Sequence, residues 1–414
     1  MNDNKKTHCS FCGAAKEECD HLVAGIDGAH ICNKCPSHIN DFFVDNFGPQ
    51  GVGESNAENL MSDSKFADFS MKPIDIYGEL SRTIVGQDKA KKAISSAVYS
   101  HYKKISVNTN GKSVLNKSNI WLIGRTGTGK TMFARALAEM LDLPFVKVDA
   151  TALTESGYTG DDVESIIGRL LQSADGDVEK AQKGIVYIDE VDKLRKMAMN
   201  LNVSRDVSGE GVQQALLTMI EGTVLSVPTD SNRKHPNSKS NIQFDTKNVL
   251  FIVGGSFAGI EELLINKQEK GIGFGANVTP AKEQDVSLSD VGNSELIKFG
   301  MIAEFVARFP VKVALDDMTL DSLKRIIQEP EGSIVNQYKE LFAMDSVELE
   351  VSDSAIHDIA HKALLSGTGA RAAQEIFESK LADAMFEVPS MPDVEAVLLE
   401  GESVLYRKKE KVAA

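Results

Sequence analysis

Short apolar runs alternate with amphipathic helical patterns through the middle of the chain. Each run spans five or six residues and is rich in branched aliphatic and aromatic side chains, which is typical of a buried strand in a parallel sheet. Five such runs occur, at residues 119–123, 144–148, 185–189, 248–253 and 311–315. The alternation predicts an α/β fold in which helices cover a five-stranded parallel sheet. Ligands of such folds bind at the carboxyl ends of the strands.

The pattern changes after Asp316, where helical periodicity dominates. We expect helices at residues 320–328, 334–342, 355–365 and 370–386, and short strands at 347–351 and 394–399. This mixture predicts a second, smaller α+β domain that is mostly helical.

All five cysteines lie within the first 35 residues. Cys9 and Cys12 form one Cys-x-x-Cys pair, and Cys32 and Cys35 form another after nineteen residues, which is the spacing of a four-thiolate zinc module. Disulfides are the competing interpretation, and we do not favour them in a chain without a secretion signal. A histidine could also replace one thiolate, the candidates being His8, His21, His30 and His38. The site offers no open position beside a base, so we expect a structural zinc ion.

Residues from about 47 to 72 lack periodicity and are rich in Gly, Ser, Asn and acidic residues, which is linker composition. We therefore expect four parts in the chain. These are a zinc-binding module at residues 1–45, a flexible linker at 46–70, a large domain at 71–315 and a small domain at 316–414.

Composition narrows the possible functions. The 414-residue chain has a net charge of −15, with 25% charged and 42% hydrophobic residues. This acidic balance argues against non-specific nucleic-acid binding, which needs a basic surface. No apolar run approaches the ~20 residues of a membrane span, and the polar N-terminus lacks the hydrophobic region of a signal peptide. We expect a cytoplasmic protein that binds neither membranes nor nucleic acid.

A complete phosphate-binding loop follows the first apolar run and opens a helical pattern. Its glycines allow backbone N–H groups to curl around phosphate oxygens, and the following helix adds the positive end of its dipole. Lys130 can reach the β- and γ-phosphates, and the Thr131 hydroxyl can ligate Mg²⁺. The predicted nucleotide-binding residues here are Gly124, Arg125, Thr126, Gly127, Thr128, Gly129, Lys130, Thr131 and Met132.

The run at residues 185–189 ends in two carboxylates, Asp189 and Glu190. A carboxylate at the tip of a strand next to the phosphate loop can hold the shell of the magnesium ion, and a second one can orient and deprotonate the attacking water. We assign Asp189 to the metal and Glu190 to the water. The two motifs together predict hydrolysis of a nucleoside triphosphate.

The zinc spacing and the nucleotide motifs occur with several other short motifs in a fixed order. These motifs lie at residues 84–87, 157–160, 205–214, 233–235, 272–274 and 369–371. The sequence resembles the ClpX family of zinc-containing AAA+ unfoldases from Cys9 to about residue 400. The resemblance implies a AAA+ P-loop ATPase that uses ATP, Mg²⁺ and Zn²⁺ and unfolds proteins for a ClpP-type peptidase.

The resemblance also implies roles at the nucleotide. Val85, Gly86 and Gln87 would lie against the adenine, although they could simply be a turn that starts a helix. Arg308 would act as a trans-acting finger on the γ-phosphate bound by the neighbouring subunit. Arg371 would sense the nucleotide in its own subunit. A finger supplied in trans requires a closed ring, and similar proteins are homohexamers.

Three further segments would act on substrates and partners. Tyr158 and Thr159 match a pore loop whose aromatic residue grips the translocating chain, with Thr159 standing where the family usually has valine. The basic residues Arg233, Lys234 and His235 would attract acidic groups of substrates at the pore entrance. For both segments an ordinary surface loop is the alternative.

Residues Ile272, Gly273 and Phe274 form an apolar tip within a glycine-rich run. Exposed apolar loops often mark partner sites. The resemblance implies docking into clefts on a peptidase ring, unless the segment folds back onto its own domain. Adaptor proteins are further expected partners.

Other functions remain open at this point. A chaperone without a peptidase, an HslU-like unfoldase, or a nucleic-acid remodelling ATPase would share the nucleotide motifs. Arg125 departs from the family, which typically has proline there, and so adds a cation near the phosphate loop.

Overall fold

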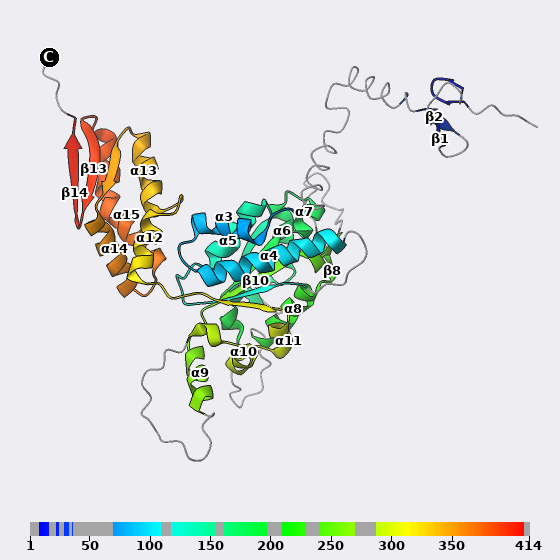
Figure 1. The fold of residues 1–414 in the computed structure, drawn as a ribbon, viewed down its shortest axis with the longest axis horizontal. Helices are drawn as coiled ribbons and strands as arrows, with labels where there is room; N and C mark the ends of the chain where they lie inside the picture. The colour runs from blue at the N-terminus through cyan, green and yellow to red at the C-terminus, as the bar shows by residue number, and fades with distance from the viewer. Residues whose placement is uncertain are drawn as a thin grey trace, which may run out of the picture. The chain divides into compact units, whose positions relative to one another are not determined.

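The structure is a computed structural model that describes residues 8–15, 22–24, 29–32, 35, 69–108, 117–154, 161–196, 209–228, 241–269 and 287–409. These residues belong to two compact units, one within residues 1–69 and one within residues 70–414, and each unit is considered by itself (Figure 1). The larger unit contains both the predicted sheet and the helical C-terminal region.

The five apolar runs form one parallel sheet. Its strand order is β11 (Val311–Ala314), β3 (Ile120–Ile123), β10 (Leu250–Gly255), β7 (Ile185–Asp189) and β4 (Phe145–Asp149). All neighbouring strands are parallel, so their carboxyl ends meet at one edge. The predicted α/β class and the five-stranded sheet are therefore confirmed.

Nine helices accompany these strands among the described residues before 316. They are α3 (Pro73–Thr83), α4 (Asp88–Asn108), α5 (Lys130–Leu141), α6 (Ser165–Ser173), α7 (Val178–Gln182), α8 (Glu210–Glu221), α9 (Ile260–Glu269), α10 (Asn293–Phe299) and α11 (Ala303–Ala307). Short 3₁₀ turns occur at η3 (Ala150–Ala152), η4 (Val191–Leu194), η5 (Thr246–Asn248) and η6 (Leu288–Asp290).

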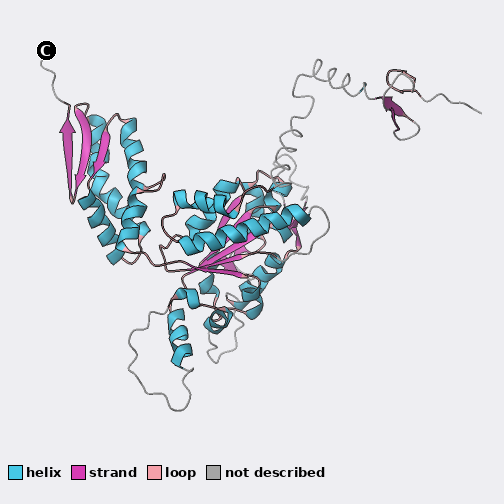
Figure 2. Cartoon of the chain, in the orientation of Figure 1, coloured by secondary structure: helices cyan, strands magenta, loops and turns pink. Residues whose placement is uncertain are grey.

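Helices cover both faces of the sheet, which explains why β3 and β10 are buried at every position. On one face Trp121 packs against Phe309 and Phe305, with ring centroids 5.3 and 5.7 Å apart. Residues of α6 and α8 complete this core. On the other face α4 contacts β11, and α5 contacts β7 and β10. Figure 2 shows the strands between the two helical layers.

Two smaller strand pairs lie outside the main sheet. β5 (Leu153–Thr154) and β6 (Asp161–Asp162) are parallel, and β8 (Val224–Pro228) and β9 (Asn241–Asp245) are antiparallel. The sequence analysis predicted neither pair, because each strand is short and pairs across a connection of several residues.

The C-terminal region combines four helices with a small sheet and has a core of its own. The helices are α12 (Leu320–Gln328), α13 (Ile334–Met344), α14 (Asp353–Leu365) and α15 (Ala370–Glu387), followed by the turn η7 (Val388–Ser390). The sheet order is β12 (Glu348–Val351), β13 (Val394–Glu400) and β14 (Ser403–Lys408). β14 was not predicted. Hydroxyl side chains cap three of the helices, at Thr319, Ser333 and Ser352.

The N-terminal unit is described for only a few residues. β1 (Leu22–Ala24) and β2 (His30–Cys32) form an antiparallel pair, and a further bridge joins His8 to Ala15. The two Cys-x-x-Cys pairs lie beside these short elements.

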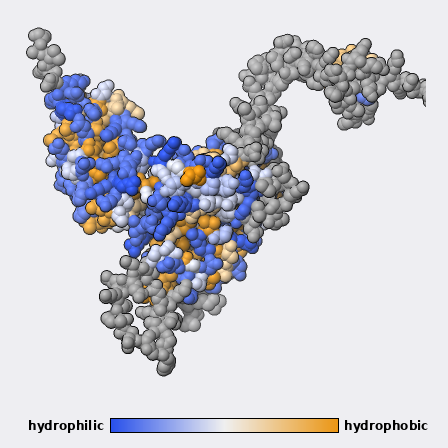
Figure 3. Space-filling view, viewed as in Figure 1, coloured by the Kyte–Doolittle hydropathy of each residue, from blue (hydrophilic) through white to orange (hydrophobic). Residues whose placement is uncertain are grey.

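Hydrophilic residues cover most of the face drawn in Figure 3, with apolar residues scattered between them. No helix in the described part of the chain is both long enough and apolar enough to span a membrane.

Candidate functional site

The phosphate-binding loop joins the end of β3 to the start of α5, as its sequence predicts. Gly127 and Gly129 have φ angles of +84° and +95°, in the left-handed region that favours glycine. Gly129 is also the N-cap of α5, so the loop's backbone leads directly into the helix N-terminus. The Thr128 hydroxyl closes the loop by donating to the Arg125 carbonyl at 2.8 Å. This geometry suits a bound phosphate group.

Lys130 lies folded over the loop. Its Nζ donates to the carbonyl oxygens of Gly124 and Arg125 at 2.6 and 2.9 Å. Burial lowers the pKa of Lys130, although the nearby Asp189, Asp192 and Glu190 carboxylates oppose that effect. The ammonium group therefore lies within the loop that would surround the phosphates.

Asp189 ends β7, two residues after Tyr187 on the same face of the strand. Its Oδ1 accepts from the Tyr187 hydroxyl at 3.0 Å and from the Glu190 N–H at 3.1 Å. Its Oδ2 accepts from the Thr131 hydroxyl at 3.2 Å and pairs with Lys147 Nζ at 3.0 Å. Burial would raise the pKa of Asp189, but these partners, led by Lys147, lower it overall. The carboxylate is therefore held as an anion beside the Thr131 hydroxyl, and such hard oxygen atoms suit Mg²⁺.

Glu190 follows in a left-handed conformation with φ of +55°, which is uncommon for a residue other than glycine. Such conformations cluster at functional sites because the surrounding structure must hold them. Here the turn separates the end of β7 from η4, and Glu190 lines the same cleft as Asp189.

One cleft of about 290 Å³ brings most of these groups together. Its lining includes Thr126, Gly127, Gly129, Lys130, Thr131, Met132, Asp189, Glu190, Asp192, Lys193, Gly255, Ser256, Ala370 and Arg371. Arg371 therefore reaches the phosphate-loop cleft from the start of α15, far away in the sequence. The two regions are in close contact, since a Cβ on Gly127 would lie 2.4 Å from the Thr368 carbonyl oxygen.

Sequence reasoning missed three polar residues of this cleft, namely Asp192, Lys193 and Ser256. Asp192 is almost fully buried and accepts from the N–H and hydroxyl of Ser256 at 3.1 and 3.0 Å. Ser256 follows β10, the strand beside β7. Ser256 could have been identified from its position directly after a strand, because the carboxyl ends of parallel strands meet at one edge of the sheet.

Val85 and Gly86 lie between α3 and α4 and line a different cleft, of about 380 Å³, with Arg325 of α12 and Glu329, the C-cap residue of that helix. The side-chain amide of Gln87 exchanges two hydrogen bonds with the backbone of Asp316, both at 2.8 Å. This segment is thus tied to the residues that follow β11.

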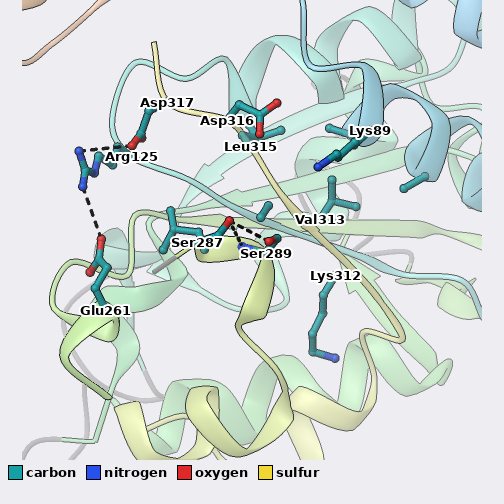
Figure 4. Close-up of a pocket in the computed structure, with 14 residues that line it drawn as sticks. Lys89, Arg125, Glu261, Ser287, Ser289, Lys312, Val313, Leu315, Asp316 and Asp317 are labelled. Carbon is teal, nitrogen blue, oxygen red and sulfur yellow. Dashed lines mark hydrogen bonds and ion pairs between the residues drawn. The ribbon is translucent and has the colours of Figure 1, made fainter. Parts of the chain in front are cut away.

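Arg125 contributes its backbone to the loop, whereas its side chain points elsewhere. Figure 4 shows its guanidinium between Asp317 and Glu261, at 3.4 and 3.8 Å. These side chains line a third cleft, of about 320 Å³, that also includes Lys89. Arg125 was expected to add a cation near the triphosphate. In the structure, however, its side chain is absent from the lining of the cleft that contains Lys130.

Arg308 follows α11 and lies outside the lining of the nucleotide cleft in the described chain. Its guanidinium pairs with Glu221, the last residue of α8. Its carbonyl accepts from the Asn119 side chain at 3.0 Å, which fixes the backbone beside the start of β3.

Three predicted segments lie outside the described residues. Tyr158 and Thr159 fall between β5 and β6, and Arg233, Lys234 and His235 fall between β8 and β9. The apolar residues Ile272, Gly273 and Phe274 fall between α9 and η6.

The four predicted cysteines lie together, with all their sulfur atoms within 4.8 Å of one another. The Sγ–Sγ distances are 3.7 Å for Cys9 and Cys35, 3.7 Å for Cys12 and Cys32, and 3.6 Å for Cys32 and Cys35. A disulfide needs about 2.05 Å. A tetrahedral zinc ion with Zn–S distances of about 2.3 Å needs about 3.8 Å. The cluster therefore fits zinc and excludes the disulfide alternative, and among the described residues its candidate ligands are the four cysteines.

The local backbone supports thiolates in this cluster. The Cys32 N–H donates to Cys9 Sγ at 3.3 Å. Backbone donors, led by the N–H of Cys12, lower the pKa of Cys9 to about 6, whereas burial raises the pKa of Cys35. Cys9 therefore carries negative charge more readily than Cys35, and a thiolate is the form that binds a metal.

Comparison with protein families gives three matches in order along the chain. Residues 7–44 match the ClpX C4-type zinc finger, residues 115–312 match an AAA domain of the Cdc48 subfamily, and residues 318–397 match the C-terminal D2-small domain of ClpB protein.

The parallel sheet, the phosphate loop and the middle match define a AAA+ ATPase that binds ATP. The zinc finger at its N-terminus distinguishes it within that class. The three matches in this order are consistent with the ClpX family, and they support a AAA+ unfoldase of the Clp family.

Proposed function

We propose that this chain uses ATP hydrolysis to unfold proteins and thread them into a ClpP-type peptidase ring. The observation that supports this best is the single cleft that joins the phosphate loop, the Asp189–Glu190 pair and Arg371. Because Arg371 begins a helix of the C-terminal region, a change at the phosphates can alter how that region packs against the sheet.

Within the cleft each group takes one task. Lys130 and the loop N–H groups bind the β- and γ-phosphates, and Thr131 and Asp189 hold Mg²⁺. Glu190 orients and deprotonates the attacking water, and Arg371 responds to the presence of the γ-phosphate. The bound magnesium ion would supply charge neutralisation at the phosphates. Val85, Gly86 and Gln87 would contact the adenine.

Arg308 acts on a neighbouring copy in this proposal. Its pairing with Glu221 at the end of α8, outside its own nucleotide cleft, is compatible with a finger directed to another subunit. The active assembly is then a closed ring, which we propose to be a homohexamer in the cytoplasm.

Three loops would contact the protein substrate or the partner peptidase. Tyr158 and Thr159 grip the substrate in the pore, and Arg233, Lys234 and His235 attract its acidic groups. Ile272, Gly273 and Phe274 dock the peptidase, and burial of Phe274 would contribute about 1.5–3 kcal/mol per contact, multiplied by avidity around the ring. The zinc module at residues 1–45 would receive substrates and adaptors, and the linker at 46–70 would separate it from the domains at 71–315 and 316–414.

The proposal is tested by separating hydrolysis, pulling and docking. Tyr158→Ala should keep ATPase activity and lose most unfolding of a stable tagged protein, because it removes the gripping ring without touching the phosphates. Phe274→Ala should keep both activities but lose binding to a ClpP-type ring and degradation. Unchanged degradation by Phe274→Ala would favour a chaperone without a peptidase.

The nucleic-acid alternative has a direct test. ATPase activity of the intact protein should rise with unfolded protein and not with DNA or RNA. Stimulation by nucleic acid alone would support a remodelling ATPase instead.

A further inference from the structure

Lys147 is a charged residue of the nucleotide site that the sequence analysis did not identify. It lies on β4, the edge strand, directly opposite Tyr187 of β7. Two residues further along, Asp149 lies opposite Asp189. Because side chains alternate along a strand, Lys147 and Tyr187 lie on one face of the sheet and both extend toward the carboxylate at the strand end. Lys147 Nζ reaches Asp189 Oδ2 at 3.0 Å.

The Asp189 carboxylate is fully occupied by donors in this arrangement. Each oxygen accepts from two groups, namely the Tyr187 hydroxyl and the Glu190 N–H on Oδ1, and the Thr131 hydroxyl and Lys147 on Oδ2. A carboxylate offers about four acceptor positions, so none is left for a further partner. A metal ion or one of its bound waters must therefore displace a donor. Lys147 is the donor of the four that carries a charge.

The position of Lys147 favours its displacement over that of the other donors. Its side chain is 41% exposed, whereas that of Asp189 is 17% exposed. A lysine has a flexible stem and a strongly hydrated ammonium group, so it can turn into solvent at little cost. The Tyr187 hydroxyl and the Glu190 N–H, in contrast, belong to β7 and its following turn.

We propose that Lys147 is a positioning residue that holds Asp189 in place and competes with Mg²⁺ for its Oδ2 atom. Lys147 thereby sets the magnesium concentration at which the nucleotide site fills. The inference depends on the proposed role of Asp189 in holding the metal. A positive charge a few ångströms from the metal also repels it, and in a water-exposed cleft this repulsion corresponds to about a threefold to thirtyfold loss of affinity.

The test measures magnesium binding and not turnover. The full-length, zinc-loaded Glu190→Gln protein is saturated with ATP, and the dissociation constant of Mg²⁺ is obtained by displacement of Mn²⁺ observed by electron paramagnetic resonance. Lys147→Met, which keeps the side-chain length and removes the charge, should bind Mg²⁺ at least about threefold more tightly. Lys147→Gln should behave in the same way, and Lys147→Arg should remain near the parent value.

Lys196→Met is the matched control. Lys196 pairs with Glu210 at 2.7 Å and is 49% exposed, so it resembles Lys147 in exposure and pairing but has a different carboxylate partner. Its substitution should leave magnesium affinity unchanged.

A second pair of variants separates this inference from the assignment of Asp189. Asp189→Asn should weaken Mg²⁺ binding, and adding Lys147→Met to it should tighten binding less than it does in the Asp189 background, because the competition for Oδ2 is gone and only the direct repulsion of the metal remains. If Asp189→Asn binds Mg²⁺ normally, the role of Asp189 is wrong and the inference fails with it. If Asp189→Asn weakens binding but Lys147→Met does not tighten it, Lys147 does not compete and the inference alone is overturned.

Discussion

The four-cysteine cluster and the nucleotide cleft of this protein are built in different ways. The four-cysteine cluster forms a small core of its own among the described residues of the N-terminal unit, with Cys9, Cys32 and Cys35 buried and Ile31 packed against them. The nucleotide cleft instead lies at the end of a five-stranded sheet whose core includes Trp121 and many other residues.

This difference shows which site exists before its ligand binds. In the N-terminal unit a zinc ion held by these cysteines would supply free energy of the kind that a hydrophobic core supplies elsewhere, so we expect metal binding and folding of the cluster to be coupled. At the nucleotide cleft the sheet and its helices hold Asp189 and the phosphate loop, and the inner strands β3 and β10 are buried between neighbours on both sides. Removing a ligand or a side chain there should change chemistry and leave the fold intact.

The largest expected effect comes from removing zinc. Cys32→Ser, or chelation, should unfold the N-terminal module up to about residue 40, because the buried cluster found in its described part is built from the cysteines that hold the metal. Basal ATPase activity should stay nearly unchanged, since the module and the sheet belong to separate compact units. The measurements are metal content, expected at about one zinc ion per chain, and the loss of structure in NMR spectra of the module.

The control for this experiment is Cys19→Ser, which changes the one cysteine outside the predicted ligand set and should retain the zinc. Reduced, freshly purified protein without zinc would contradict the four-thiolate site. A parallel loss of ATPase activity would show that the two units depend on each other.

Glu190→Gln should have the next largest effect. The amide cannot accept the proton of the attacking water, so ATP hydrolysis should fall at least about 100-fold while ATP binding persists. The thermal unfolding temperature should change little, because Glu190 lies in the turn after β7 and no described hydrogen bond depends on its side chain. Steady-state turnover and binding of a fluorescent ATP analogue measure the two quantities.

Glu139→Gln provides the comparison, because Glu139 is an exposed carboxylate near the other end of α5. It should hydrolyse ATP at the normal rate. Normal turnover in Glu190→Gln would remove Glu190 from the proposed mechanism.

Local sequence patterns predicted the elements of the sheet but not the contacts between them. All five strands occur within two residues of their predicted limits, because a buried parallel strand is a continuous apolar run that a short window reveals. The phosphate loop, Asp189 and the cysteines are equally local. Lys147 and Ser256 are different. Lys147 reaches Asp189 at the end of the neighbouring strand, and Ser256 reaches Asp192 in the turn η4, and both carboxylates are distant in sequence. Strand order and register, which sequence spacing does not encode, create these contacts.

The C-terminal sheet shows a second reason why part of the fold could not be predicted from the sequence. β14 pairs with β13 as an edge strand, and its residues are only exposed or half-buried, so its hydrophobic pattern is weak. Gly401, with φ of +56°, lies in the turn between these strands and was the available hairpin signal.

The smallest expected effect concerns Tyr187, which connects the core to the site. Its ring is buried, burial raises the pKa of its hydroxyl, and the hydroxyl donates to Asp189. Tyr187→Phe removes one of four donors to the carboxylate, so we expect a loss of about 0.5–1.5 kcal/mol in the free energy of unfolding and a fall in turnover of less than about tenfold. Chemical denaturation and steady-state ATPase assays measure these changes.

A partner substitution sharpens the prediction for Tyr187. A Cβ on Gly254 of β10 would lie 2.3 Å from the Tyr187 hydroxyl oxygen and 3.0 Å from the ring carbon that bears it. Gly254→Ala should therefore destabilise the protein more in the parent chain than in Tyr187→Phe, where the closest clash is absent. Equal destabilisation in both backgrounds would place the strain elsewhere. A loss of turnover in Tyr187→Phe as large as in Glu190→Gln would mean that the phenol takes part in the chemistry, and the core would then do more than position Asp189.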